Sequence, residues 1–208
     1  MTNILLHGLG QDSSSWKEVK ELLAECGKNV FIPDLFKMAK SPLSYSVLYY
    51  ELEKICKQTG DQINICGLSM GGVLALNYAN RHPEKVNSLV LIGIPYIVPQ
   101  EMIEKQNAMF EAMPEEAFGG LGIAKSDFIR LVNELSNIDI PGLVEKISCR
   151  CLVICGENDA ANLDSAMHIH EKIGDSYLVI IKESGHEINK DNPKDLAKEN
   201  GNFINKNK

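Results

Sequence analysis

Ser69 stands at the centre of the pentapeptide GLSMG (residues 67–71), which has G-x-S-x-G spacing. An apolar run at 63–66 precedes it and another at 73–76 follows, so a sharp turn between a strand and a helix is predicted around the serine. Such a turn strains the serine backbone, raises its hydroxyl at the sheet edge, and needs glycines because strand and helix approach closely. This context predicts a nucleophile. The alternative, a nucleotide-binding turn, is disfavoured because the spacing is not G-x-G-x-x-G and no P-loop lysine follows.

A base and a carboxylate that suit this serine follow two later apolar runs. His186 comes after a glycine at the end of the last run, and Asp159 lies three residues beyond Gly156, which ends the run before it. An aspartate in this place can accept a hydrogen bond from the histidine and fix its tautomer. Glu157 is the alternative carboxylate, disfavoured because the loop needs length to turn back over the sheet edge. The order Ser69, Asp159, His186, each just after a strand, predicts a Ser-His-Asp triad.

Another motif, HGLG at residues 7–10, follows the first apolar run. A glycine-lined turn there can present a backbone N–H group to a substrate oxygen, together with the N–H of the residue after the serine. The predicted oxyanion hole therefore consists of the backbone of Leu9 and Met70. His7 is interpreted as a structural residue of this loop, with a catalytic base as the alternative. His168 and His170 stand two apart on a predicted helix, so they do not face one another.

Six short apolar or β-branched runs predict the strands that position these groups. Most are continuous, as in strands buried on both faces of a parallel sheet. Helical patterns separate them, which predicts a doubly wound, mostly parallel α/β sheet of order 2-1-3-4-5-6 flanked by helices. In this order the direction in which strands are added to the sheet reverses between the first and third strands. Open α/β sheets place their binding sites at such a point. The predicted strands are 3–7, 29–33, 62–66, 88–93, 151–155 and 177–182, and the predicted helices are 16–26, 44–57, 70–80, 162–173 and 193–204.

Residues 95–146 break this alternation, since they hold helical patterns at 100–113 and 125–135 and no convincing strand. We interpret them as a helical cap inserted into an α/β core of residues 1–94 and 147–208. The Met and Phe side chains of the insertion suggest a pocket for an apolar group, with ordinary helix packing as the alternative for any one of them. The predicted pocket residues are Met102, Met109, Phe110 and Met113.

Composition disfavours several classes of partner and location. The 208 residues carry a formal net charge of −7 with the two signs interspersed, which disfavours nucleic acid and anionic membranes. No run reaches the ~18 apolar residues of a transmembrane helix, and the N-terminus lacks the features of a signal peptide. A cytoplasmic location with reduced cysteines is therefore expected. Cys149, Cys151 and Cys155 share a strand face, but without C-x-x-C pairs they are interpreted as buried hydrophobes rather than metal ligands.

These features together resemble the α/β-hydrolase superfamily across nearly the whole chain. The resemblance implies that Ser69, Asp159 and His186 form the triad and that the backbone of Leu9 and Met70 forms the oxyanion hole. The GLSMGG segment is similar to that of small carboxylesterases, enol-lactonases, cofactor-free haloperoxidase-type enzymes and monoglyceride lipases. The matching segments are 7–10 with Trp16, 67–72, 81–86, 156–159 and 185–186.

The sequence thus predicts a serine hydrolase that cleaves a small or medium apolar ester, thioester or lactone through an acyl-enzyme on Ser69. No metal or organic cofactor is predicted. The expected partner is a small-molecule acyl substrate, and the oligomeric state stays open. One alternative uses the same triad for a lyase or perhydrolase reaction. Another is a non-catalytic small-molecule binder, which the presence of all three groups argues against.

Overall fold

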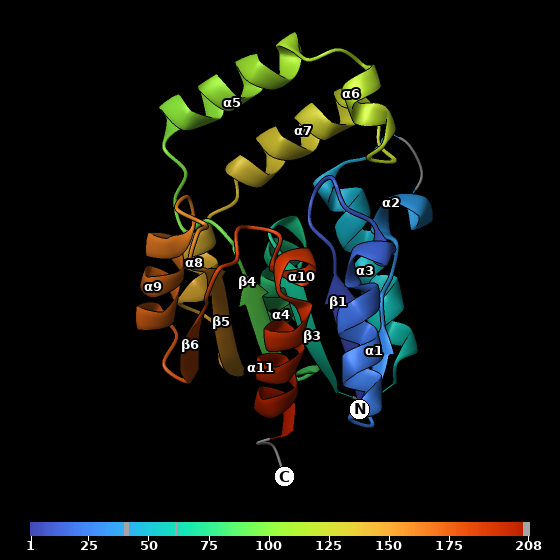
Figure 1. Cartoon of the computed structure of the whole chain (residues 1–208), viewed down its shortest axis with the longest axis vertical. Helices are drawn as coiled ribbons and strands as arrows, with labels where there is room; N and C mark the ends of the chain where they lie inside the picture. Colours follow the sequence, from blue (N-terminus) through green and yellow to red (C-terminus); the bar gives the residue numbers. More distant parts are fainter. Residues whose placement is uncertain (40–41, 61, 206–208) are drawn as a thin grey trace.

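Six parallel strands form one sheet in the computed structural model, which describes residues 1–39, 42–60 and 62–205 (Figure 1). Their order is β2-β1-β3-β4-β5-β6, and every neighbouring pair is parallel. The predicted strands and the predicted order are confirmed, with strand ends that shift by up to two residues. The strands are β1 (Thr2–Leu6), β2 (Asn29–Phe31), β3 (Ile63–Leu68), β4 (Val86–Ile92), β5 (Arg150–Gly156) and β6 (Ser176–Ile181).

The longer helices agree with the sequence prediction to within one residue at each end. They are α1 (Lys17–Glu25), α3 (Tyr45–Gln58), α4 (Met70–Arg81), α5 (Gln100–Ala112), α7 (Lys125–Ser136), α9 (Leu163–Lys172) and α11 (Pro193–Asn205). The sequence prediction missed the short elements, because one helical turn shows no hydrophobic period. These are η1 (Ser13–Trp16), α2 (Leu35–Met38), α6 (Glu116–Gly119), α8 (Ile140–Val144) and α10 (Ile188–Asp191).

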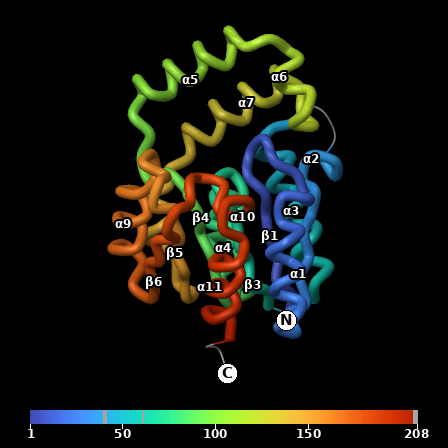
Figure 2. The backbone as a smooth tube through the Cα atoms, viewed as in Figure 1, coloured from blue at the N-terminus to red at the C-terminus, as the bar shows by residue number. Residues whose placement is uncertain are grey.

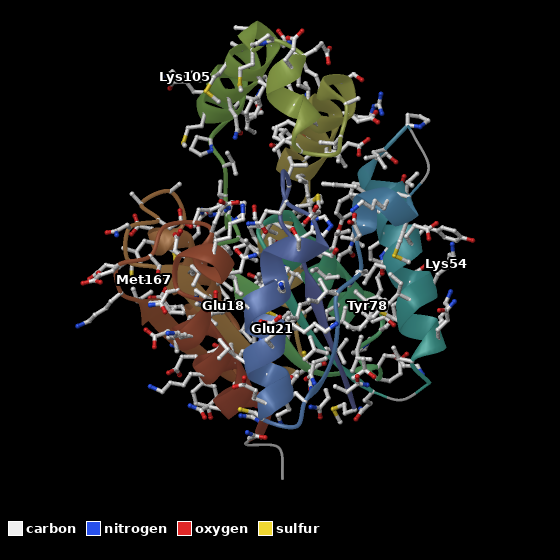
Figure 3. The ribbon with its side chains drawn as sticks, turned by 45° about the vertical axis from the view of Figure 1, so that its right-hand side comes forward. Glu18, Glu21, Lys54, Tyr78, Lys105 and Met167 are labelled. Atoms are coloured by element: carbon white, nitrogen blue, oxygen red, sulfur yellow. The ribbon has the colours of Figure 1, made fainter. Side chains whose placement is uncertain are left out.

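Helix α1 shows how local sequence sets these elements. Val19 and Leu23 are buried on one side, while Glu18 and Glu21 are exposed on the outer surface (Figure 3). The helix ends at Glu25, and Gly27 follows the C-cap with a φ of 72°, the left-handed conformation that closes helices. The amphipathic pattern therefore fixes which face of α1 meets the sheet.

Helices cover both faces of the sheet and create two apolar cores. One face is covered by α1 and α11, where the buried side chains of Trp16 and Phe203 pack with sheet residues such as Val90. The other face is covered by α3, α4, α8 and α9, whose side chains share the larger core. With both faces covered, the carboxyl edge of the sheet is the place left for a site.

Helices α5, α6 and α7 lie above the carboxyl ends of the strands, opposite the N-terminus (Figures 1 and 2). Helix α5 packs against α7, where Phe110 meets Phe128 edge-on at a centroid distance of 4.9 Å. Helix α7 is joined to the core by Arg130, which donates to the carbonyl of Leu43 at 2.9 Å. Helix α8 packs against α4 and α9 of the core. The division into a core of 1–94 and 147–208 and a cap of 95–146 stays a prediction.

Among the described helices, none combines the length and apolar character needed to cross a membrane.

Candidate active site

Ser69 occupies the turn between β3 and α4 with a φ of 52°, a conformation that non-glycine residues rarely adopt. Its N–H donates to the carbonyl of Ile92 at 2.8 Å, which fixes the turn against β4. A Cβ on Gly67 would lie 2.2 Å from the carbonyl carbon of Gly71, and a Cβ on Gly71 would lie 2.5 Å from the carbonyl oxygen of Leu6. The strained strand-to-helix turn therefore has the form that the sequence predicts, and its glycines are required by close backbone approach.

His186 and Asp159 form a hydrogen-bonded pair at the same sheet edge. The imidazole Nδ1 of His186 lies 2.8 Å from Oδ2 of Asp159, a buried carboxylate. A carboxylate only accepts, so Nδ1 carries the proton and Nε2 is free to accept one. Glu157, the alternative carboxylate, instead accepts the backbone N–H of Glu183 at 3.1 Å.

Asn162 is a further partner of this pair that the sequence analysis did not single out. Its Nδ2 donates to Oδ1 and Oδ2 of Asp159, at 2.9 and 3.0 Å, and lies 3.3 Å from Nδ1 of His186. The side chain of Asn162 is buried and also lines the adjacent cavity. It therefore holds the carboxylate in the orientation that faces the imidazole.

These contacts set the charges of the pair. Burial alone would raise the pKa of Asp159, but the hydrogen bonds from His186 and Asn162 outweigh it and hold that pKa below its usual value. The hydrogen bond to Asp159 raises the pKa of His186 above its ordinary 6.5, against the opposing effect of burial. The carboxylate is thus ionised at neutral pH, and the imidazole is a stronger base than a free histidine.

Ser69 and His186 line one cavity of about 330 Å³ beneath α5 and α7. Leu9, Met70 and Gly93 line the same cavity. Across the described chain, no hydrogen bond joins Ser69 directly to His186. The structure therefore brings all the predicted triad and oxyanion residues to one place, Asp159 through its contact with His186.

The two predicted oxyanion donors, Leu9 and Met70, both line this cavity and have N–H groups without a protein acceptor within the described residues. Met70 is the first residue of α4, so its N–H has no acceptor inside the helix. Within the described residues, the N–H of Leu9 has no protein acceptor either. Gly8, beside Leu9, lies against the serine, since a Cβ there would be 3.6 Å from Cβ of Ser69. A helix N-terminus and the loop of Gly8 and Leu9 therefore lie beside the serine, an arrangement suited to a developing negative charge.

His7 has the structural role expected for it. Its Nε2 accepts the N–H of Leu35 at 3.1 Å, and its Nδ1 lies 3.0 Å from the carbonyl oxygen of Gly8, so Nδ1 is the donor. Burial lowers the pKa of His7, which keeps the fully buried ring neutral. Both ring nitrogens are occupied by backbone, so this imidazole supports the loop and has no nitrogen left for a substrate.

The walls of the cavity are mainly apolar. Met102 of α5 is one of them, but Met109, Phe110 and Met113 are not among the lining residues that the described structure provides. Met109 is exposed and Phe110 packs on Phe128. The other lining residues, not singled out from sequence, are Val73, Gly93, Pro95, Ile97, Val98, Pro99, Gln106, Val132, Leu135, Ser136, Ala161 and Asn162.

Gly93 is the position where an added methyl group most directly disturbs the pair. Its φ is 54°, and a Cβ there would lie 3.1 Å from Nδ1 of His186 and 3.2 Å from Oδ2 of Asp159. We expect Gly93→Ala to displace the imidazole and to lower kcat/KM for any reaction that uses the pair by about 10²-fold. The matched control is Gly122→Ala, where φ is also positive, at 67°, and nothing lies within 4 Å of the added Cβ. Equal kcat/KM in both variants would show that Gly93 does not set the position of the pair.

The chain was compared with known protein families and proteins. Residues 4–119, more than half of the chain, match the family described as alpha/beta hydrolase fold. A pimeloyl-[acyl-carrier protein] methyl ester esterase of Aromatoleum aromaticum is 36% identical over 90 residues, which are 43% of this chain and 36% of that enzyme.

Solved structures agree over the whole length. A thermophilic esterase from Thermogutta terrifontis superposes with a TM-score of 0.83 at 20% identity, covering 99% of this chain and 90% of that one. An enol-lactonase from Burkholderia xenovorans LB400 superposes with a TM-score of 0.83 at 17% identity, covering 98% and 91%. The parallel sheet, the strained serine turn and the family match lead to one conclusion: the chain belongs to the alpha/beta hydrolase fold family.

Proposed function

We propose that this protein is a serine hydrolase in which Ser69 is the nucleophile, His186 the general base and Asp159 the residue that orients the base. The observation that carries the proposal is the hydrogen bond between Asp159 and His186 at a cavity that the strained Ser69 turn also lines. The bond leaves Nε2 of the imidazole as the free nitrogen, the atom that a serine proton must reach. Membership of the family supports hydrolysis as the reaction.

The proposed reaction is acyl transfer to water through a covalent intermediate. Nε2 of His186 takes the hydroxyl proton of Ser69 while Oγ attacks the substrate carbonyl carbon. The N–H groups of Leu9 and Met70 stabilise the resulting oxyanion. The imidazolium then protonates the leaving alkoxide or thiolate as its bond to the carbonyl carbon breaks. A water molecule, deprotonated by the same imidazole, attacks the acyl-enzyme, and proton return to Ser69 Oγ releases the acid.

The cavity favours a neutral, mainly apolar acyl group of small or medium size. Apart from His186, its lining within the described residues contains no ionisable side chain, and a buried carboxylate on the substrate would find no cationic partner. The methyl ester esterase named above matches at 36% identity, which supports an ester as the substrate, and the enol-lactonase keeps a lactone as the alternative.

Covalent labelling tests the nucleophile directly. A fluorophosphonate probe is expected to attach to Ser69, identified by peptide mass spectrometry, and saturating amounts should abolish hydrolysis of p-nitrophenyl butyrate. Labelling with no ester hydrolysis would indicate the lyase or perhydrolase use of the triad. A chain that neither reacts with the probe nor hydrolyses the ester would be a binder, and the proposal would be wrong.

The pH dependence follows from the raised pKa of His186. Only the neutral imidazole can accept the proton of Ser69, so kcat/KM is expected to fall as the pH drops through that pKa. Because the contact with Asp159 raises the pKa, the midpoint of the fall should lie above 6.5. The measurement is kcat/KM for p-nitrophenyl butyrate from about pH 5 to about pH 9. A midpoint below 6.5 would contradict the assignment of His186 as the base.

A further inference from the structure

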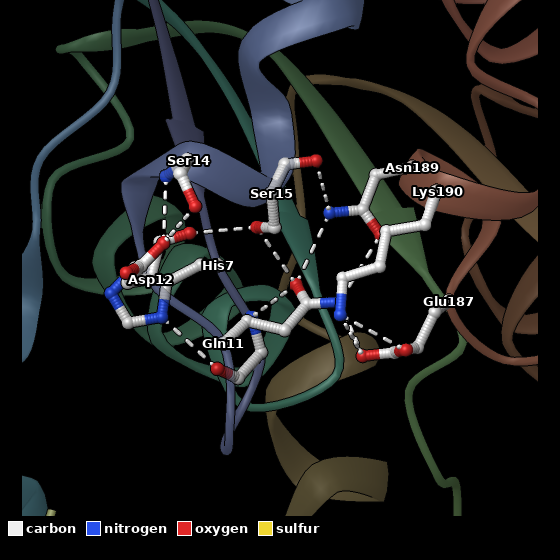
Figure 4. Close-up of polar contacts among 9 residues, drawn as sticks. His7, Gln11, Asp12, Ser14, Ser15, Glu187, Asn189 and Lys190 are labelled. Carbon is white, nitrogen blue, oxygen red and sulfur yellow. Dashed lines mark hydrogen bonds and ion pairs between the residues drawn. The ribbon is translucent and has the colours of Figure 1, made fainter. Parts of the chain in front are cut away.

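A polar cluster with a buried centre and a half-exposed carboxylate, Glu187, joins the loop that precedes η1 to the loop that carries His186 (Figure 4). Its central residue is Gln11, whose side-chain amide lies between Glu187 and Asn189. Gln11 and Asn189 are 5% and 2% exposed, although both are polar. Burying two amides is unfavourable unless their hydrogen bonds are made, so the contacts of this cluster define its role.

The side-chain amide of Gln11 forms hydrogen bonds through both its nitrogen and its oxygen. Nε2 donates to Oε1 of Glu187 at 2.7 Å and to Oδ1 of Asn189 at 3.3 Å. Oε1 accepts the backbone N–H of Gly8 at 3.4 Å, Nδ2 of Asn189 at 3.1 Å and Oγ of Ser15 at 3.2 Å. One side chain thus binds the Gly8 backbone on one side and the residue after His186 on the other.

The charge of Glu187 strengthens this connection. Burial would raise the pKa of Glu187, but the hydrogen bonds from Gln11 and Lys190 lower it, so the carboxylate is ionised. A hydrogen bond to an ionised acceptor is stronger than one between neutral groups. Asn189 adds a second link, since its Nδ2 also donates to the carbonyl of Ser15 at 3.1 Å.

The two residues that Gln11 connects, Gly8 and Glu187, each lie next to a residue of the proposed mechanism. Gly8 precedes Leu9, which lines the cavity, and Gly8 itself lies against Ser69. Glu187 directly follows His186. Gln11 is not among the described residues that line the cavity, so a direct contact with substrate does not explain its burial.

We propose that Gln11 is a positioning residue that fixes the oxyanion loop and the His186 loop relative to each other. The inference rests on the proposed function, because the two loops matter together only if both act on one carbonyl group. Errors of about 1 Å in such geometry can cost on the order of 10²-fold in rate. The contribution should therefore be seen in kcat rather than in KM.

The test combines a truncation with a reversal of the hydrogen bond. Gln11→Ala is expected to lower kcat for p-nitrophenyl butyrate at least about 10-fold with KM changed less than about 2-fold. Gln11→Glu places two carboxylates at hydrogen-bond distance and should lose at least as much. Adding Glu187→Gln to Gln11→Glu should restore most of kcat, because the amide on residue 187 can then donate to the carboxylate on residue 11.

The matched control is Asn64→Ala, which removes an equally buried amide at the opposite end of the sheet. Asn64 is 4% exposed, donates to Asn3 at 2.9 Å and accepts from Ser88 at 2.7 Å. It lies five residues before Ser69 along β3, roughly 16 Å away in an extended strand. This variant should lose stability without a selective loss of kcat.

Amide hydrogen exchange gives a readout that needs no turnover. Exchange at residues 8–11 and 186–190 should be faster in Gln11→Ala than in the wild type, and unchanged there in Asn64→Ala. If kcat and exchange in Gln11→Ala match the wild type, or the double variant recovers nothing, the positioning role is wrong while labelling of Ser69 still supports the hydrolase. If the wild type is neither labelled nor active, the proposed function fails and the positioning role fails with it, even where exchange shows that the loops are coupled.

Discussion

Ser69→Ala is expected to lower kcat for p-nitrophenyl butyrate by about 10³-fold or more. The substitution removes the atom that would form the acyl-enzyme, while the proposed oxyanion N–H groups and the cavity remain. Weak residual activity is therefore expected. KM should change little, since the cavity walls are unaltered. The measurement is steady-state hydrolysis together with fluorophosphonate labelling, which should also be lost.

A suitable control for this substitution is Ser46→Ala, at an exposed site on α3. It makes the same chemical change outside the cavity and should leave both hydrolysis and labelling as in the wild type. If Ser69→Ala keeps wild-type hydrolysis, the nucleophile lies elsewhere and the proposed mechanism is wrong.

Asp159→Asn is expected to cost about 10⁴-fold in kcat. An amide at this position can donate to the imidazole, which stabilises the tautomer with the proton on Nε2, and that nitrogen can then no longer accept the proton of Ser69. The loss of the carboxylate also removes the main cause of the raised pKa of His186, so the acid limb of any residual activity should move to lower pH. Both effects are measured in one pH–rate profile.

Glu157→Gln separates this effect from a general loss of negative charge. Glu157 lies on the same loop, and its carboxylate accepts the N–H of Glu183 rather than contacting the imidazole. The variant removes the same charge two residues away and should keep kcat within about 3-fold. Equal losses in the two variants would show that Asp159 does not act through His186.

The fold and the candidate triad could be predicted from the sequence because both depend on local patterns. Buried strands require runs of apolar residues, and these runs are visible in the sequence. Each strand of a parallel sheet that is covered on both faces must be apolar. The change from apolar to polar residues before Ser69, Asp159 and His186 therefore marks where each strand ends. Parallel strands end at one edge, which places the three residues together without any knowledge of distances. Asp159 and His186 are in hydrogen-bond contact, and Ser69 and His186 line one cavity, while the catalytic roles of the three stay a prediction.

The residues of the cavity wall were harder to predict from the sequence, because they depend on how far along a helix a residue lies and on which side of the helix it lies. Met102 and Met109 are seven residues apart and thus share a face of α5, yet they are separated by roughly 10 Å along the axis. Only Met102 reaches the cavity. Phe110 points instead to α7 and Phe128. Apolar character alone cannot distinguish these positions, since packing between α5 and α7 also requires it.

Asn162 and Gln11 were missed for a different reason. Neither belongs to a motif with fixed spacing, and amides are common in loops. Their importance arises from contacts between segments far apart in the chain, such as Gln11 with Glu187. The signal that could have identified them is an amide residue in a loop that follows a strand of the site. Whether such a residue is buried cannot be predicted, because loop residues show no periodic pattern of apolar positions.

Asn162 has a consequence for anyone who wishes to redesign this enzyme. The same side chain forms part of the cavity wall and donates to both oxygens of Asp159. A substitution there chosen to enlarge the cavity would also remove hydrogen bonds from the carboxylate of Asp159 and raise its pKa. The shape of the cavity and the ionisation of Asp159 are therefore linked through one amide, so a variant that changes the first also changes the second.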